Sequence, residues 1–145
     1  MFGQNREQLR QMYVDTWAKF CSDQPLQPLE KQLADVIALH PEYHRLLEQS
    51  AEACGKDYLP ESGETNPFLH MGLHMAIQEQ LATDRPAGIR SLYQKMLSQF
   101  PDRHTLEHQI MECLTEMIWQ SQRNNVIPDE KSYLQCVGKL SGQAE

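Results

Sequence analysis

The sequence predicts an all-α protein, and two observations support this fold class. Apolar residues recur at intervals of three and four along most of the 145 residues, which is the spacing of helices that bury one face. No segment has the period-two alternation, bounded by turn residues, that is typical of strands. The length fits one domain with its own core. We therefore expect residues 1–145 to form a single compact bundle of about four main helices with short peripheral helices.

Three helices are expected in the first third of the chain. Residues 5–22 carry an apolar stripe at helical spacing that runs from Leu9 to Phe20, and we expect this stripe to be buried. Proline residues separate this segment from a second helix over 28–40 and a short third helix over 41–52. Proline divides these segments because it lacks an amide hydrogen and disfavours helical backbone in the preceding residue.

A loop and then a well-marked helix start are predicted next. Residues 55–65 combine glycine, proline and serine with acidic residues, which is typical of a loop. Asn66 is a favourable N-cap, and Pro67 follows at the first helical position, where its missing donor costs nothing. The buried face of this helix is expected to include Leu69.

Three further helices complete the predicted bundle. Pro86 is expected to open the first of them. Asp102 is expected to cap a long helix that reaches about Arg123. Pro128 and Asp129 are expected to begin a final short helix.

The charge balance argues against nucleic acid as a partner. The chain has 13 Lys and Arg against 20 Asp and Glu, for a net charge of −7. Phosphate binding needs clustered basic residues, and those present here are dispersed. An acidic surface suits a basic protein partner or simple solubility, and the sequence does not indicate an oligomeric state.

The cysteines and the apolar runs indicate a cytoplasmic protein. The chain has no Cys-x-x-Cys pair, which argues against a zinc knuckle or a redox dithiol. It also lacks a charged segment followed by an apolar export signal, and its apolar runs are too short for a membrane span. We therefore expect four reduced thiols, at Cys21, Cys54, Cys113 and Cys136.

All six histidines fall into pairs that are four residues apart. On a helix this spacing puts both rings on one face, where they can share a ligand or a hydrogen-bond network. Because His40 precedes Pro41, we expect it to be an N-cap or linker residue whose ring need not meet its partner. The pairs are His40 with His44, His70 with His74, and His104 with His108.

A metal site is the first hypothesis for these rings. Two rings from one helix would meet two rings and a carboxylate from another. Such ligands suit Zn²⁺, and a mixture of histidine and carboxylate in a helical bundle also suits Fe or Mn in a dinuclear centre. The motifs of the common enzyme classes are absent, so no reaction is indicated. The predicted metal ligands are His70, His74, His104, His108 and Glu112.

Two other hypotheses explain the histidines without a metal. In the first, the His/Glu cluster is a structural hydrogen-bond network in a non-enzymatic module whose exposed helix face binds another protein. In the second, the rings line a pocket for a small anionic ligand, or act as acid and base on a substrate. The counter-charge would come from Arg45, Arg90 or Arg123.

Several motifs together resemble one known family. They are the segments 40–44 (HPEYH), 66–80 (beginning NPFLH), 88–90, 107–114 and 119–123. Their combination is similar to a small bacterial family known only as domain of unknown function 1841, and the likeness covers nearly the whole chain. The resemblance implies a single-domain protein of Gram-negative bacteria. It implies no reaction, because the family has no assigned activity.

Overall fold

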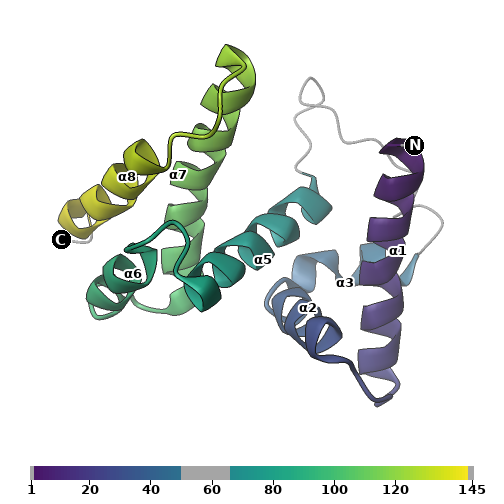
Figure 1. Cartoon of the computed structure of the whole chain (residues 1–145). Coiled ribbons are helices and arrows are strands. Elements are labelled where there is room, and N and C mark those ends of the chain that lie inside the picture. The colour runs from purple at the N-terminus through teal and green to yellow at the C-terminus, as the bar shows by residue number, and fades with distance from the viewer. Residues whose placement is uncertain (1, 50–65, 144–145) are drawn as a thin grey trace. The chain divides into compact units, whose positions relative to one another are not determined.

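The computed structural model describes residues 2–49 and 66–143, and every regular element in these ranges is a helix (Figure 1). The predicted all-α class is therefore confirmed. In the same ranges, no helix is both long and apolar enough to cross a membrane. The predicted loop over 55–65 lies outside the described residues. The elements are α1 (Phe2–Cys21), α2 (Pro28–Ala38), the 3₁₀ helix η1 (Pro41–Tyr43), α3 (His44–Glu48), α5 (Pro67–Thr83), α6 (Ile89–Leu97), α7 (Arg103–Asn124) and α8 (Glu130–Gln143).

The chain divides into two compact units, Met1–Met75 and Ala76–Glu145. The division falls inside α5, so the first turns of this helix belong to the first unit and its last turns to the second. Both units contain buried apolar side chains. The expectation of a single domain over residues 1–145 stays a prediction.

The first unit is built around α1, which packs against α2 and α3 (Figure 1). The start of α5 adds to this core, because the ring of Phe68 meets the ring of Tyr13 edge-on with 5.6 Å between centroids. An ion pair of 2.8 Å between Lys19 Nζ and Glu30 Oε2 joins the end of α1 to the start of α2. The core consists of Tyr13, Val14, Trp17, Leu33, Val36, Ile37, Leu47, Phe68 and Met71.

The predicted start of α5 is confirmed in detail. Asn66 Oδ1 accepts hydrogen bonds from the amides of Phe68 and Leu69, at 3.0 and 3.2 Å. Pro67 is the first helical residue. The prediction that Leu69 is buried is wrong, since 61 % of it is exposed. Successive residues are about 100° apart around a helix. Because Phe68 faces the core, Leu69 points away from it.

The predicted apolar stripe of α1 is wrong at both ends. Leu9 and Phe20 are 52 % and 42 % exposed, whereas Arg10 is buried. The guanidinium of Arg10 lies 4.9 Å from the centroid of the Phe68 ring, and this cation–π contact favours a charged side chain facing inward. Leu9 is therefore turned away. Phe20 lies in the last turn and covers one face of Trp17, with ring centroids 5.2 Å apart.

The second unit contains α6, α7 and α8, which pack against one another (Figure 1). Asp102 caps α7 as predicted, because its Oδ1 accepts a hydrogen bond of 2.7 Å from the amide of Thr105. The hydroxyl of Tyr133 on α8 donates a hydrogen bond of 2.6 Å to Gln80 Oε1 on α5. The buried apolar side chains of this unit include Ile77, Ile89, Tyr93, Met96, Leu106, Ile110, Met111, Leu114, Val137 and Leu140.

Two predicted helix boundaries in the second unit need correction. Helix α6 begins at Ile89 and not at Pro86. The carboxylate of Asp84 accepts hydrogen bonds from the amides of Gly88 and Arg90, at 3.2 and 3.0 Å, and this turn occupies the residues after the proline. Gly88 has a φ of 102°, which glycine adopts without strain. Helix α8 has 14 residues, so it is longer than the short helix predicted.

The expectation of four reduced thiols is wrong. Cys113 on α7 and Cys136 on α8 form a disulfide with 5.8 Å between their Cα atoms. The two cysteines are 23 residues apart, and only the packing of α7 against α8 brings them together. A search for closely spaced cysteines cannot find such a pair. Cys21 is free and exposed, and Cys54 lies outside the described residues.

Candidate functional site

The histidines are divided between the two units, and each unit positions its rings in a different way. Those of the first unit lie at the end of α2, at the start of α3 and on α5. Those of the second unit lie on α7. The first unit holds His40, His44, His70 and His74, and the second holds His104 and His108.

The first histidine pair caps the carboxyl end of α2. His40 Nδ1 lies 2.8 Å from the carbonyl oxygen of Val36, and His44 Nε2 lies 2.8 Å from that of Ile37. Carbonyls in the last turn of a helix are left for groups outside the helix to satisfy. The two rings thus meet adjacent carbonyls, although His40 reaches back four residues and His44 reaches back seven. The His44 ring also lies 4.2 Å from the Trp17 ring, centroid to centroid.

The hydrogen bond to Val36 fixes the proton of the His40 ring. A carbonyl oxygen only accepts, so Nδ1 must be the protonated nitrogen and Nε2 of the neutral ring carries the lone pair. Histidines that bind metals are commonly held in this way by a carbonyl on the other ring nitrogen. His40 is fully buried, and its ring stacks on Tyr43 with 5.4 Å between centroids.

Tyr43 is half-buried beside the His40 ring. Burial raises the pKa of the Tyr43 hydroxyl, and the charge of the adjacent Glu42 raises it further. The hydroxyl therefore keeps its proton throughout the neutral range. It can donate a hydrogen bond there.

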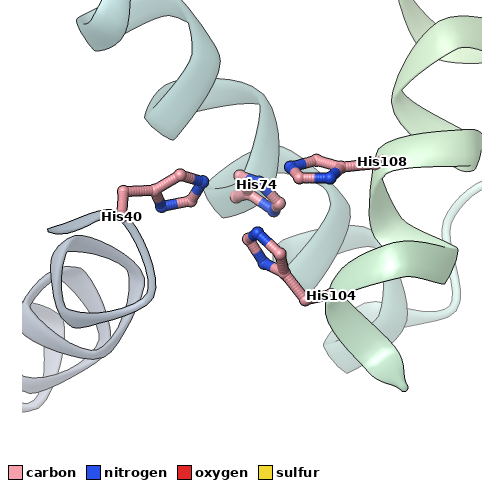
Figure 2. Close-up of side chains that lie close together, drawn as sticks. All are labelled: His40, His74, His104 and His108. Atoms are coloured by element: carbon pink, nitrogen blue, oxygen red, sulfur yellow. The ribbon is translucent and has the colours of Figure 1, made fainter. Parts of the chain in front are cut away.

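The first unit brings three imidazoles together. The centroid of the His40 ring lies 4.9 Å from that of His70 and 4.8 Å from that of His74. The rings of His70 and His74 lie 5.0 Å apart on successive turns of α5. His74 is fully buried and His70 is half-buried. Figure 2 shows the ring of His40 facing that of His74.

His40 was predicted to be an N-cap or linker residue, and it is the N-cap of η1. Its ring nevertheless joins those of α5. Proline at position 41 indicated the backbone role correctly, but a local argument gives no information on where a side chain points in the folded unit. The signal available in the sequence was the shared spacing of the three pairs.

The second unit places its two rings on the first turns of α7. The rings of His104 and His108 lie 4.2 Å apart, centroid to centroid, with an angle of 64° between their planes (Figure 2). Both side chains are half-buried. Glu112 follows one turn later and is exposed. Of the predicted metal ligands on α7, the two histidines therefore lie at the edge of the core and Glu112 lies in solvent.

Two of the three arginines proposed as counter-charges have other contacts, and the third is exposed. Arg90 donates hydrogen bonds to the carbonyls of Leu81 and Ala82, at 3.0 and 2.9 Å. The guanidinium of Arg123 lies 4.9 Å above the ring of Trp119. Arg45 is exposed on α3. These contacts do not favour the hypothesis of an anion-binding pocket.

Comparison with known families identifies the chain. The sequence pattern of a family described as a domain of unknown function (DUF1841) matches residues 5–139, so the chain belongs to this family. Neither the curated proteins nor the solved structures include a match to the chain.

Proposed function

We propose that this member of the DUF1841 family binds one divalent transition-metal ion through four imidazoles. The side chains of His40, His74, His104 and His108 could hold a metal ion through one ring nitrogen each. Compared with the set predicted from the sequence, the proposal adds His40 and omits His70 and Glu112.

The observation that carries the proposal is the orientation of His40. Its Nδ1 is held by the Val36 carbonyl, which leaves Nε2 as the nitrogen with the lone pair. Its ring lies against that of His74, and both side chains are fully buried. Burying polar rings is costly unless they are hydrogen-bonded or bind a metal. A metal ion would bind both rings, one of which α2 already holds in a fixed orientation.

The ligand set favours Zn²⁺ over Fe and Mn. Four neutral nitrogen ligands suit Zn²⁺, Cu²⁺ or Ni²⁺, whereas iron and manganese centres in helical bundles use several carboxylates. Zinc accepts four ligands in a tetrahedron without a preference imposed by d electrons. Four protein ligands also fill that tetrahedron, which is typical of structural zinc sites. The proposed role is therefore structural or regulatory, with no reaction assigned.

Metal analysis of untagged protein tests the proposal. We expect one equivalent of zinc after dialysis against Zn²⁺. Replacing His74 by Gln removes a ligand, and we expect a loss in zinc affinity of about 100- to 1,000-fold, because one of four ligands carries roughly a quarter of the about 10–16 kcal/mol of a structural zinc site. His70→Gln is the matched control, one turn away on α5, and should bind zinc like the wild type.

The outcomes separate the proposal from its main alternative. If the histidines form only a structural network, the protein binds no stoichiometric zinc, and His74→Gln lowers stability without any effect of metal. If His70→Gln weakens zinc binding as much as His74→Gln does, the proposed ligand set is wrong.

A further inference from the structure

The second half of α7 turns one of its faces to solvent. Residues that are three, four or seven positions apart lie on the same face of a helix, and four exposed residues have this spacing here. Helices α6 and α8 pack against other sides of α7, where its buried side chains lie. All of these elements belong to the second unit. The outer face, as we call it, consists of Glu116, Trp119, Gln120 and Arg123.

The apolar part of the outer face is Trp119, which is half-exposed. An indole ring left in water costs free energy that is recovered when another surface covers it, and tryptophan is enriched at the centres of protein interfaces. The Arg123 guanidinium lies 4.9 Å from the centroid of this ring. Gln120 Nε2 donates a hydrogen bond of 2.8 Å to Glu116 Oε1. Side chains that are already held in place lose less conformational entropy when a partner binds.

The charges of the outer face are complementary to those of a second copy. Glu116 and Arg123 are about 10 Å apart along the helix axis, at about 1.5 Å per residue, and Trp119 lies near the midpoint. A twofold axis through this midpoint places Glu116 of each copy opposite Arg123 of the other and brings the two Trp119 rings together. A wholly basic or wholly acidic partner would match only one end of the face. We propose that two copies of this chain associate through their outer faces, with their α7 helices antiparallel.

Each residue of the outer face has a role in this dimer. The guanidinium of Arg123 is planar, so one side stays on the Trp119 ring while the edge donates hydrogen bonds to the partner's Glu116. The charge pairs orient the two copies, and the indole rings supply most of the affinity. Because a single helix face gives a small interface, we expect a dissociation constant on the order of 10 µM. None of these residues is a candidate metal ligand, so the dimer does not depend on the proposed function.

Sedimentation equilibrium of the full-length chain tests the proposal. A chelator is present throughout, so that a metal ion cannot link two copies, and the concentration covers about 1 µM to 1 mM to bracket the expected constant. Trp119→Ala should weaken association by about 30-fold, the effect of an interface hot spot. Arg123→Glu places carboxylates opposite one another and should weaken it by about 100-fold. The matched control is Lys139→Glu, which makes the same charge change at an exposed position of α8 and should associate like the wild type.

A mixture of two charge variants tests the antiparallel geometry. Glu116→Arg alone sets arginines against each other, and Arg123→Glu alone sets glutamates against each other, so neither variant should form a dimer with itself. In a mixture of the two, every arginine meets a glutamate, and association should return. Circular dichroism of each variant checks that its helices are intact. A wild-type chain that stays monomeric over the whole range, or a mixture that does not associate, would overturn the proposal. So would association that is unchanged by Trp119→Ala.

Discussion

The two units of this chain hold their helices together by different means. In the first, aromatic rings and histidines do much of the packing, and His40 and His44 cap the end of α2. In the second, largely aliphatic side chains fill the space between α6, α7 and α8, and a disulfide links α7 to α8. The comparison teaches that one helical unit reaches stable packing by non-covalent contacts alone, whereas the other adds a covalent bond between two helices. The two units should therefore respond differently to the same treatment.

The largest effect is expected from the core of the first unit. Trp17 is 7 % exposed, and Trp17→Ala should lower the free energy of unfolding by about 3–5 kcal/mol. Trp119 of the second unit is half-exposed, which makes Trp119→Ala the matched control with a loss of about 1 kcal/mol or less. Urea unfolding followed by circular dichroism measures both. Equal losses would show that the two tryptophans do not differ in their contribution to packing.

Removal of the disulfide should destabilise the second unit alone. The disulfide closes a segment of 23 residues, so its removal by Cys113→Ser with Cys136→Ser should cost about 3 kcal/mol. Hydrogen exchange resolved by peptide should speed up in α7 and α8 and remain unchanged in α1 and α2. Faster exchange across both units would contradict the independence of the two cores.

A smaller effect is expected from the hydroxyl of Tyr133. Tyr133→Phe leaves Gln80 Oε1 without the donor that lies 2.6 Å away, and the free energy of unfolding should fall by about 1–2 kcal/mol. The wild type, both single variants and the double variant with Gln80→Ala form a double-mutant cycle that measures the pair directly. A coupling energy near zero would mean that this bond does not stabilise the contact between α5 and α8.

The smallest effects are expected from two carboxylates, one in each unit. The backbone and side-chain hydrogen bonds of Thr105 lower the pKa of Asp102, and the hydrogen bonds from Lys19 and the Gln27 amide lower that of Glu30. A lowered pKa in the folded state contributes stability above the ordinary carboxyl pKa of about 4, and this contribution disappears as the pH falls through the folded value.

Asp102→Asn and Glu30→Gln should each lower the melting temperature slightly at pH 7. The difference from the wild type should shrink as the pH is lowered below about 4. Melting curves over this pH range provide the measurement. A difference that grows toward acid pH would contradict the assigned sign.

Local signals allowed the sequence to predict much of the fold. The caps of α5 and α7 depend on Asn66 and Asp102 and their neighbours in the chain, so they could be recognised without tertiary information. The start of α6 was missed because Asp84 reaches forward to two amides of a glycine turn. The disulfide was missed because its partners meet only when two helices pack.

The sequence allowed us to predict that histidines form the candidate site, but not which of the histidines lie together. Helical spacing identified the histidines of α5 and α7, since that spacing alone puts rings on one face. It could not tell His40, whose ring lies beside His74, from His44, whose ring turns to Trp17. That difference arises from which carbonyl of α2 each ring meets.

The bond between His40 and Val36 has a wider consequence. Because a carbonyl in the last turn of α2 holds the proton on Nδ1 of His40, this turn determines that the basic nitrogen of the ring is Nε2. A substitution that unwinds this turn would release the ring proton from its fixed position, even with every histidine in place. The position of the ring proton thus depends on residues several positions away, in a helix that itself carries no histidine.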